Sequence, residues 1–362
     1  MSIKVLVIAN YRPTVAVRSE AEIFIALQKD FGYDITIMTF ADSEYVERFK
    51  SVGIRVIDFH PEAKFKPAYI RRIREELCTG NYQVMHLFNN KAMINGLLAA
   101  INIPVKVAIY RGYTGNINWW DPFMYLKYLS PRVDKIVCLV EAIRVLIRKN
   151  LFFNKDKAIT INKGHDVNWY NNTVPVDLGL PQNAFKITCV ANIRPMKGLQ
   201  YLLKATHYLS KDSNIHILLM GRGMDHPRFK KLIDDSPIKN QIINLGYRKD
   251  VLNVVKASDA FVLPSIKGEA ITKSVIEAMC LEVAPIITDI PGNVGLVIDG
   301  DSGLVVPPHN AKALADAMVK LSSDKDLTIR LGKKAREHID KNLNTRDTVK
   351  AFDAMYKDLV AS

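Results

Sequence analysis

The segment SDAFVLPSIKGEAITKSVIEAM, residues 258–279, contains the change of pattern on which the fold prediction rests. Its run DAFVL is apolar and bounded by polar residues, which predicts a buried strand ending at Pro264 and Ser265. The loop IKGEAI follows, and Thr272 is placed to cap a helix over KSVIEAMCL. This puts Glu269 on the loop and Glu277 inside the helix.

Two carboxylates at such a turn need an explanation. Ligands of an open parallel sheet collect beyond the carboxyl ends of the strands, where unpaired helix amides favour anions. A ligand with both a diphosphate and sugar hydroxyls fits, because amides bind the phosphates and each carboxylate accepts hydrogen bonds from hydroxyl groups. A nucleotide sugar is such a ligand. The alternative, a solvated Glu269 and a surface Glu277, is the commoner case for two isolated glutamates.

Outward from this segment, short apolar runs alternate with amphipathic stretches along the whole chain. This alternation predicts an α/β fold with doubly wound parallel sheets. The predicted strands are 3–9, 34–40, 55–59, 84–88, 106–110 and 135–140, then 185–192, 214–220, 241–245, 259–263 and 284–288. Residues 161–184, rich in Asn, Pro and Gly, separate the two series and indicate two domains joined near 163–184.

Cations stand at a second turn, in VANIRPMKGLQYLL, residues 190–203. A strand ends there, Pro195 stiffens the turn, and a helix is expected to begin at Gly198. Arg194 and Lys197 lie at the helix entrance, where positive charge opposes the helix dipole unless an anion lies between them. Phosphate binding is therefore favoured over two exposed loop charges.

Six segments together carry a family resemblance. They are VANIRPMKG, LLMGRGMDHP (218–227), NLGYRKDV (244–251), residues 258–279, APIITDIPGN (284–293) and DGDSGLVVPPHNAKALADAM (299–318). In order and spacing this half resembles the donor domain of retaining nucleotide-sugar glycosyltransferases of the GT-B fold, family four. GHDV (164–167) resembles the hinge of that family and residues 20–39 its first helix and second strand. The implied architecture is two Rossmann-like domains facing a central cleft.

The resemblance also implies roles for individual residues. Glu277 would bind the ribose diol and Glu269 the hydroxyls of the donor sugar. The diphosphate would meet the backbone of Ala270, Ile271, Thr272 and Lys273, together with Arg194 and Lys197. Gly221 and Arg248 would also contact the donor, with residues 221–223 beside the base. Glu269, Arg194 and Lys197 are the predicted catalytic residues.

The chain departs from the family pattern at several places. The turn after the first strand, NYRPTVAVRSEAE (10–22), lacks glycine, and Arg12 and Arg18 are candidates for anion or acceptor binding there. Arg111 stands at or near the position where many members have a histidine in the acceptor domain. The usual phosphate-binding arginine would fall at Asn192, and Gly295 replaces a common glutamate.

Composition limits the partners. The chain has 362 residues and a formal charge of +13, which favours anionic partners such as phosphates, nucleic acid or an acidic membrane. No apolar run approaches the roughly 18 to 20 residues of a spanning helix, so a cytoplasmic protein is expected. The four cysteines are far apart and the histidines unpaired, so no metal site or cofactor is predicted. The D-x-D patterns at 299–301 and 324–326 are expected to be solvated turns.

Two basic segments, 64–77 and 141–153, are candidates for peripheral contact with an anionic bilayer at the inner face of the plasma membrane. A solvated helix face is an equal alternative for each. The aromatic stretch GNINWWDPFMYLKYL (115–129) is expected to be a core helix, with a sugar-stacking acceptor wall as the alternative.

These observations predict an acceptor domain over 1–164 with the closing helix 346–362 packed on it, and a donor domain over 165–345. The predicted reaction is transfer of a sugar, with retention and without a metal, from a UDP-sugar, or second a GDP-sugar, to a hydroxyl of a glycan or lipid-linked acceptor. Bacterial polysaccharide or lipopolysaccharide synthesis is the expected context. Alternatives are a nucleotide-sugar epimerase and a basic nucleic-acid-binding protein, the latter leaving both glutamates unexplained.

Overall fold

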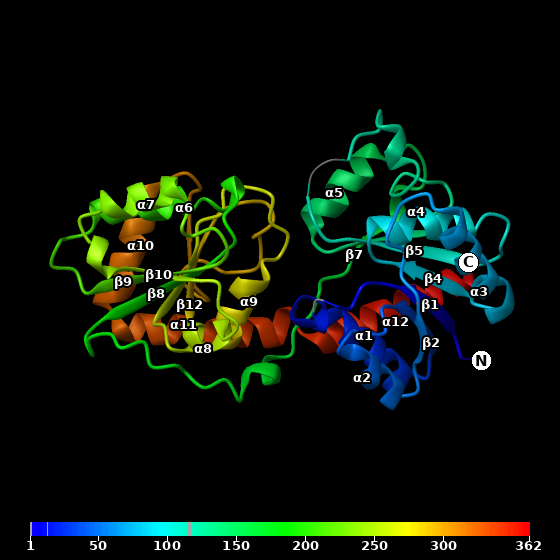
Figure 1. The fold of residues 1–362 in the computed structure, drawn as a ribbon, viewed down its shortest axis with the longest axis horizontal. Helices are drawn as coiled ribbons and strands as arrows, with labels where there is room; N and C mark the ends of the chain where they lie inside the picture. Colours follow the sequence, from blue (N-terminus) through cyan, green and yellow to red (C-terminus); the bar gives the residue numbers. More distant parts are fainter. Residues whose placement is uncertain (1, 13, 115–116) are drawn as a thin grey trace. The chain divides into compact units, whose positions relative to one another are not determined.

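The computed structural model describes residues 2–12, 14–114 and 117–362. The chain divides into two compact units (Figure 1). Unit 1 comprises Met1–Gly164 with Thr345–Ser362, and unit 2 comprises His165–Asn344. The unit boundaries differ from the predicted domain boundaries only at Thr345, which begins the closing helix and belongs with unit 1.

Unit 1 has a seven-stranded sheet in which every pairing is parallel. Its strands are β1 (Lys4–Ile8), β2 (Asp34–Thr39), β3 (Arg55–Asp58), β4 (Val84–Leu87), β5 (Lys106–Arg111), β6 (Lys135–Cys138) and β7 (Ala158–Thr160). The order across the sheet is β3-β2-β1-β4-β5-β6-β7. The connections therefore run outward in both directions from the β1/β4 pair, which is the topological switch point of this sheet.

Helices cover both faces of this sheet (Figure 1). They are α1 (Thr14–Phe31), α2 (Tyr45–Ser51), α3 (Pro67–Gly80), α4 (Asn90–Ala99), α5 (Glu141–Asn150) and α12 (Thr345–Ala361), with 3-10 turns at Pro122–Met124 and Lys155–Lys157. The closing helix α12 lies beside α1, and its apolar face joins the core formed by β1 and β2. The Tyr356 hydroxyl also lies 2.6 Å from Nδ1 of buried His86 in β4. The closing helix is therefore an integral part of unit 1.

Unit 2 has a six-stranded parallel sheet of order β10-β9-β8-β11-β12-β13. Its strands are β8 (Phe185–Val190), β9 (Ile215–Met220), β10 (Ile242–Gly246), β11 (Ala260–Leu263), β12 (Ala284–Thr288) and β13 (Leu304–Val306). Its helices are α6 (Leu199–Ala205), α7 (Pro227–Asp234), α8 (Val251–Lys256), α9 (Lys273–Cys280), α10 (Ala311–Ser323) and α11 (Lys325–Asn342), with 3-10 turns at Val167–Tyr170, Pro195–Lys197, Thr206–Tyr208 and Lys239–Gln241. One core packs α6, α7 and α10 on one face, and another packs α8, α9 and α11 on the other (Figure 1).

The predicted α/β class and parallel sheets are confirmed. Two strands were missed, β7 and β13, because each has only three residues and carries too short a pattern. The prediction of a core helix over 115–129 is wrong for the part that the structure describes, since 117–129 contains one 3-10 turn and exposes Trp119, Trp120 and Phe123. Residues 115 and 116 of that stretch lie outside the described residues.

Candidate functional site

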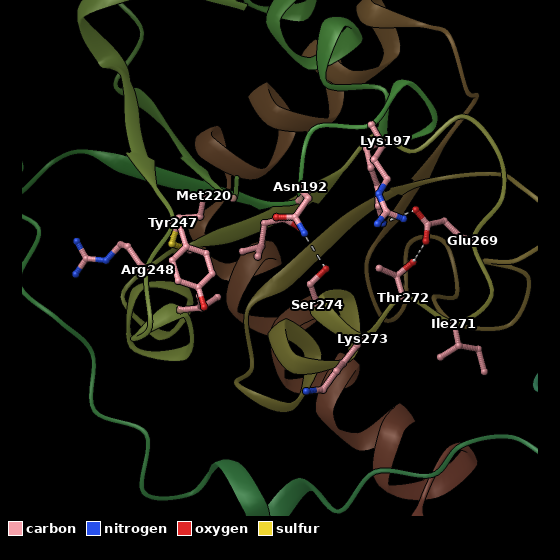
Figure 2. Close-up of a pocket in the computed structure, with 15 residues that line it drawn as sticks. Asn192, Lys197, Met220, Tyr247, Arg248, Glu269, Ile271, Thr272, Lys273 and Ser274 are labelled. Atoms are coloured by element: carbon pink, nitrogen blue, oxygen red, sulfur yellow. Dashed lines mark hydrogen bonds and ion pairs between the residues drawn. The ribbon is translucent and has the colours of Figure 1, made fainter. Parts of the chain in front are cut away.

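A pocket of about 440 Å³ opens at the switch point of the unit 2 sheet, beyond the carboxyl ends of β8 and β11. Helix amides and loop side chains converge at such a position, which makes it the expected ligand site of an open α/β sheet. Figure 2 shows the residues that surround it. They are Val190, Ala191, Asn192, Arg194, Lys197, Met220, Gly221, Tyr247, Arg248, Val251, Glu269, Ile271, Thr272, Lys273 and Ser274.

A buried carboxylate organises one end of the pocket. Glu269 is 7% exposed, and Lys197 Nζ lies 2.6 Å from its Oε1. Ser265 Oγ donates to the same oxygen at 2.7 Å, and Thr272 Oγ1 donates to Oε2 at 3.1 Å. A carboxylate has about four acceptor sites, so three donors leave it little capacity for sugar hydroxyls. Glu269 is thus built chiefly to hold the Lys197 ammonium at the pocket (Figure 2).

The loop before α9 is held in a strained shape. Ile271 has φ +46°, a conformation that β-branched residues rarely adopt. Its N–H donates to the Gly292 carbonyl at 3.2 Å, and a Cβ on Gly292 would lie 1.8 Å from the Glu269 carbonyl oxygen. Only glycine allows the turn at 292 to approach this closely. The Ile271 amide is therefore engaged within the protein and is not among the amides available to a diphosphate.

The start of α9 lacks a side-chain cap. Thr272 occupies the predicted N-cap position, but its hydroxyl makes no capping bond and donates to Glu269 instead. The first amides of a helix have no partner within the helix and attract anions when no side chain satisfies them. The helix therefore begins at the predicted place without a side-chain cap, and the Thr272 hydroxyl is bonded to Glu269 instead.

Glu277 lies one turn into α9, beyond the residues that line the pocket. Lys273 Nζ, which does line it, lies 3.1 Å from Glu277 Oε1. The Glu277 side chain is 12% exposed, and burial raises the pKa of its carboxyl while Lys273 partly offsets this. Glu277 is thus a mostly buried carboxylate that is linked to the pocket through its ion-pair partner Lys273.

The turn after β8 supplies a second cation. Arg194 is exposed at the pocket, and no carboxylate of the described residues lies within ion-pair distance of it. Asn192, at the position of the family's usual arginine, also lines the pocket, with Oδ1 accepting from the Arg222 N–H at 3.0 Å. Gly198, predicted to begin a helix, is the αL residue before α6, and a Cβ there would meet the Pro264 carbonyl oxygen at 1.9 Å. Glycine at this position lets the cationic turn approach the Glu269 loop closely.

Gly221 and Arg248 line the opposite end of the pocket. A Cβ on Gly221 would lie 2.0 Å from the Ala191 carbonyl oxygen, so only glycine can lie this close to the Ala191 backbone. Arg248 is paired through two nitrogens with Asp250, at 2.8 and 2.6 Å. Tyr247, not predicted, exposes its ring here, with the Arg222 guanidinium 4.9 Å from the ring centroid.

The three candidate arginines, Arg12, Arg18 and Arg111, lie in unit 1. Arg12 Nε donates to both oxygens of Asp42, at 2.7 and 3.0 Å, and its guanidinium lies 3.5 Å from the Phe40 centroid. Arg18 is half-buried in α1. Arg111 is 1% exposed, its guanidinium 3.4 Å from the Tyr113 centroid and 4.6 Å from that of Tyr128. An anion would reach Arg111 only after these rings move.

Sequence reasoning missed Ser265 and Tyr247 as site residues. Ser265 is the last residue before the Glu269 loop, so its position at a strand end was a usable signal. Apart from its position in NLGYRKDV, no feature of the sequence indicates that Tyr247 belongs to the site. Among 2–12, 14–114 and 117–362 no group of three or more His, Cys, Asp or Glu side chains is arranged to hold a metal ion.

Two family models match the chain. The model described as "Glycosyl transferases group 1" matches residues 171–338, and that described as "Glycosyltransferase Family 4" matches residues 21–169. A galactosyltransferase of Escherichia coli that acts on α-D-GlcNAc-diphosphoundecaprenol with UDP-Gal is 25% identical over 299 residues, covering 78% of this chain and 76% of that protein. Together the two models span nearly all of the chain.

Solved structures agree in fold. A glycosyltransferase from Rickettsia africae ESF-5 superposes with a TM-score of 0.81 at 21% identity, covering 99% of both chains. HepE from Anabaena, solved in complex with UDP, gives a TM-score of 0.76 at 17% identity, covering 99% of this chain and 100% of that one. The architecture is GT-B, and the chain belongs to the group 1 glycosyltransferases of family 4, which makes it a transferase.

Proposed function

We propose that this glycosyltransferase moves a sugar from a nucleotide diphosphate sugar to a hydroxyl of a glycan or lipid-linked acceptor, with retention at the anomeric carbon. The observation that carries the proposal is the unit 2 pocket, where Lys197 and Arg194 face the uncapped start of α9. This arrangement suits a diphosphate. We favour UDP as the nucleotide of the donor, with GDP second, since the name of the E. coli relative includes UDP-Gal and HepE was solved in complex with UDP.

In the proposed mechanism the leaving diphosphate gains charge as the glycosidic bond breaks. The Lys197 ammonium, fixed by Glu269, and the Arg194 guanidinium neutralise that charge, together with the amides that begin α9. Glu277 accepts hydrogen bonds from the ribose hydroxyls. Ala270, Ile271, Thr272 and Lys273 shape the diphosphate site, although the Ile271 amide is already bonded to Gly292. Gly221 leaves room for the nucleoside.

A chelator is expected to leave turnover intact, because the proposed site meets the diphosphate charge with Lys197, Arg194 and helix amides. The measurement is release of nucleoside diphosphate from a UDP-sugar with acceptor, before and after EDTA treatment. Loss of activity that returns with Mg²⁺ or Mn²⁺ would show that a divalent cation takes part.

For the acceptor we propose a lipid-linked glycan of a bacterial surface polysaccharide or lipopolysaccharide, supported by the undecaprenol-linked substrate in the name of the E. coli relative. Within the described part of the chain, no helix has the length and apolar character needed to cross a membrane. Contact with a lipid-linked acceptor would then occur at a bilayer surface.

Unit 1 has an aromatic surface suited to that contact, comprising Trp119, Trp120, Phe123, Phe152 and Phe153. Phe153 is 86% exposed and Trp120 68%. Segments 119–123 and 150–153 are in contact, since the Trp119 and Phe152 ring centroids lie 5.9 Å apart and the Trp119 backbone N–H donates to Asn150 Oδ1 at 3.1 Å. Exposed Lys149 and Lys155 adjoin it. Aromatic side chains with nearby cations favour the interface of an anionic bilayer.

The double variant Trp120→Ser/Phe153→Ser is expected to lose most binding to vesicles of phosphatidylcholine with phosphatidylglycerol, because it removes the two most exposed rings. Co-sedimentation measures the bound fraction. Tyr208→Ser, an exposed aromatic of unit 2, is the matched control and should bind like the native chain. Equal binding by the double variant would rule out this surface as the membrane contact.

A further inference from the structure

Unit 1 has an apolar pocket near the amino ends of its last two strands. Its volume is about 400 Å³, and Val133, just before β6, and Lys157, just before β7, both line it. The strands of this sheet are parallel, so the pocket lies at the edge opposite to the carboxyl ends, where ligands of such sheets usually bind. The site is therefore separate from any site at the carboxyl ends of this sheet.

A buried lysine lines this pocket. Lys157 is 6% exposed, and its Nζ donates to the Ser130 carbonyl oxygen at 3.0 Å. No carboxylate of residues 2–12, 14–114 and 117–362 lies within ion-pair distance of this ammonium. An ammonium has more N–H groups than one carbonyl can accept, so Lys157 keeps donor capacity for a ligand.

The carboxylate that acts on Lys157 from a distance is Asp134, and it is already engaged. Asp134 Oδ2 accepts from Arg132 Nη1 at 3.2 Å and from the Val107 N–H at 2.7 Å. Burial lowers the pKa of Lys157, and the charge of Asp134 only partly offsets this effect. Buried ammonium groups are normally paired with an anion. The described part of the protein does not supply that anion here.

The remaining walls are mainly apolar and continue to the surface. Leu129, Val133 and Leu151 are buried in the pocket, whereas Phe152 and Phe153 are exposed beside them. An alkyl chain that contacts these side chains would leave water and would cover exposed aromatic rings. The apolar walls thus favour a hydrocarbon chain.

Polar ligands find few partners in the same pocket. Asn150, which lines it, uses both ends of its side chain within the protein, since Oδ1 accepts from the Trp119 N–H at 3.1 Å and Nδ2 donates to the Leu146 carbonyl at 2.9 Å. A sugar or nucleotide would bury hydroxyls without partners. A small anion would pair with Lys157 but leave the apolar walls uncovered. A ligand with an alkyl chain and one anionic end satisfies both features.

We propose that this pocket binds a single alkyl chain that ends in a carboxylate or phosphate, with the anionic end at Lys157 and the chain along Leu129 and Leu151. Free fatty acids and anionic lipids of a bilayer share this chemistry. The proposal does not depend on glycosyl transfer, because the donor pocket belongs to unit 2. It adds a specific lipid site beside the aromatic surface, with which it shares Phe152 and Phe153.

Calorimetric titration of the full chain tests the ligand class, with each compound below its critical micelle concentration. The compounds are octanoate, decanoate, dodecanoate, decyl glucoside and decyltrimethylammonium. Decanoate should bind at least about tenfold more tightly than the neutral and cationic decyl compounds, because only it pairs with the ammonium. Each added methylene should tighten carboxylate binding about three- to fourfold until the pocket is filled.

Two variants locate the site. Lys157→Met should weaken dodecanoate binding about ten- to a hundredfold and leave decyl glucoside unchanged. Lys155→Met, at an exposed position of the same 3-10 turn, is the matched control and should bind dodecanoate normally. Leu129→Phe, which narrows the pocket, should weaken dodecanoate more than octanoate. Melting temperatures check that each variant is folded.

Four results would overturn the proposal. They are no carboxylate binding, decyl glucoside binding as tight as that of decanoate, equal dodecanoate binding in folded Lys157→Met, and equal dodecanoate binding in folded Leu129→Phe. Lys157 would then only link the start of β7 to Ser130. If Lys157→Met does not fold, the Leu129→Phe result decides.

Co-sedimentation with vesicles of phosphatidylcholine and phosphatidylglycerol separates the two sources of the ligand. Vesicle binding that is lost in Lys157→Met, together with weakened dodecanoate binding, would assign the site to a bilayer lipid. Unchanged vesicle binding with weakened dodecanoate binding would assign it to a free fatty acid. Dodecanoate binding by a native chain that binds no vesicles would sustain this site and reject the membrane contact proposed above.

Discussion

Replacing Lys197 by methionine should lower kcat/KM by about 10²–10³ while weakening binding of the intact donor by less than about tenfold. Removal of one preorganised charge donor has this magnitude when the charge develops in the transition state. Lys197 meets the condition, because Glu269 holds its ammonium at 2.6 Å within the pocket. Steady-state kinetics and calorimetry with a UDP-sugar give the two quantities.

The Lys197 experiment needs a control for damage to Glu269. Without the lysine, buried Glu269 keeps Ser265 and Thr272 as its side-chain donors among the described residues, and breaking a buried pair typically costs about 3–5 kcal/mol of stability. The double variant Lys197→Met/Glu269→Gln removes both charges. It should stay as slow as the single variant, and recovery of its kcat/KM would mean that stranded Glu269, not lost Lys197, caused the defect. Exposed Lys267→Met should be unaffected.

Glu277→Ala is expected to raise the dissociation constant for the nucleotide about ten- to a hundredfold, since a hydrogen bond to a charged group contributes about 1.5–3 kcal/mol. The carboxylate is mostly buried on α9, one turn beyond the pocket wall, where a ribose hydroxyl pair would approach it. Isothermal titration with UDP provides the measurement.

Two further variants separate a direct role of Glu277 from an indirect one. Lys273→Met removes the ion-pair partner and should weaken binding less than Glu277→Ala if the glutamate itself meets the ribose. An equal loss in both would mean that Glu277 acts only by placing Lys273. Glu282→Gln, just beyond α9, controls for the change in net charge and should bind UDP normally.

The sequence predicts the elements of this fold well where strands are long enough to have a pattern. The strand, loop and helix of this segment lie where DAFVL, IKGEAI and KSVIEAMCL place them, except that the strand begins at Ala260 and the helix ends at Cys280, one residue before the predicted end. Strands β7 and β13 were not predicted, because three residues are too few to show an alternation of apolar and polar side chains. The stretch 117–129 misleads because its aromatics suggest burial, whereas the structure exposes them.

The sequence predicts which residues belong to the candidate site better than it predicts the contacts among them. Lys197 and Glu269 stand 72 positions apart, and no periodicity indicates that they form an ion pair. Likewise, Gly292 approaches Glu269 only because β12 lies next to β11 in the sheet. Whether a side chain caps its helix also depends on tertiary contacts, because the Thr272 hydroxyl donates to Glu269, whereas Asn89 Oδ1 accepts from the amides of Lys91 and Ala92 at the start of α4.

A thermal-shift comparison of UDP, GDP, ADP, CDP, dTDP and inorganic pyrophosphate tests the nucleotide-sugar assignment most directly. A ligand at about 100 times its dissociation constant stabilises the native state by about 2.7 kcal/mol, which raises the melting temperature of a domain of this size by about 5–10 °C. We expect one nucleoside diphosphate, UDP, to give that rise, and folded Glu277→Ala to lose most of it. Equal shifts with all five diphosphates and pyrophosphate, preserved in Glu277→Ala, would mean that the +13 chain merely attracts phosphate and that the assignment is wrong.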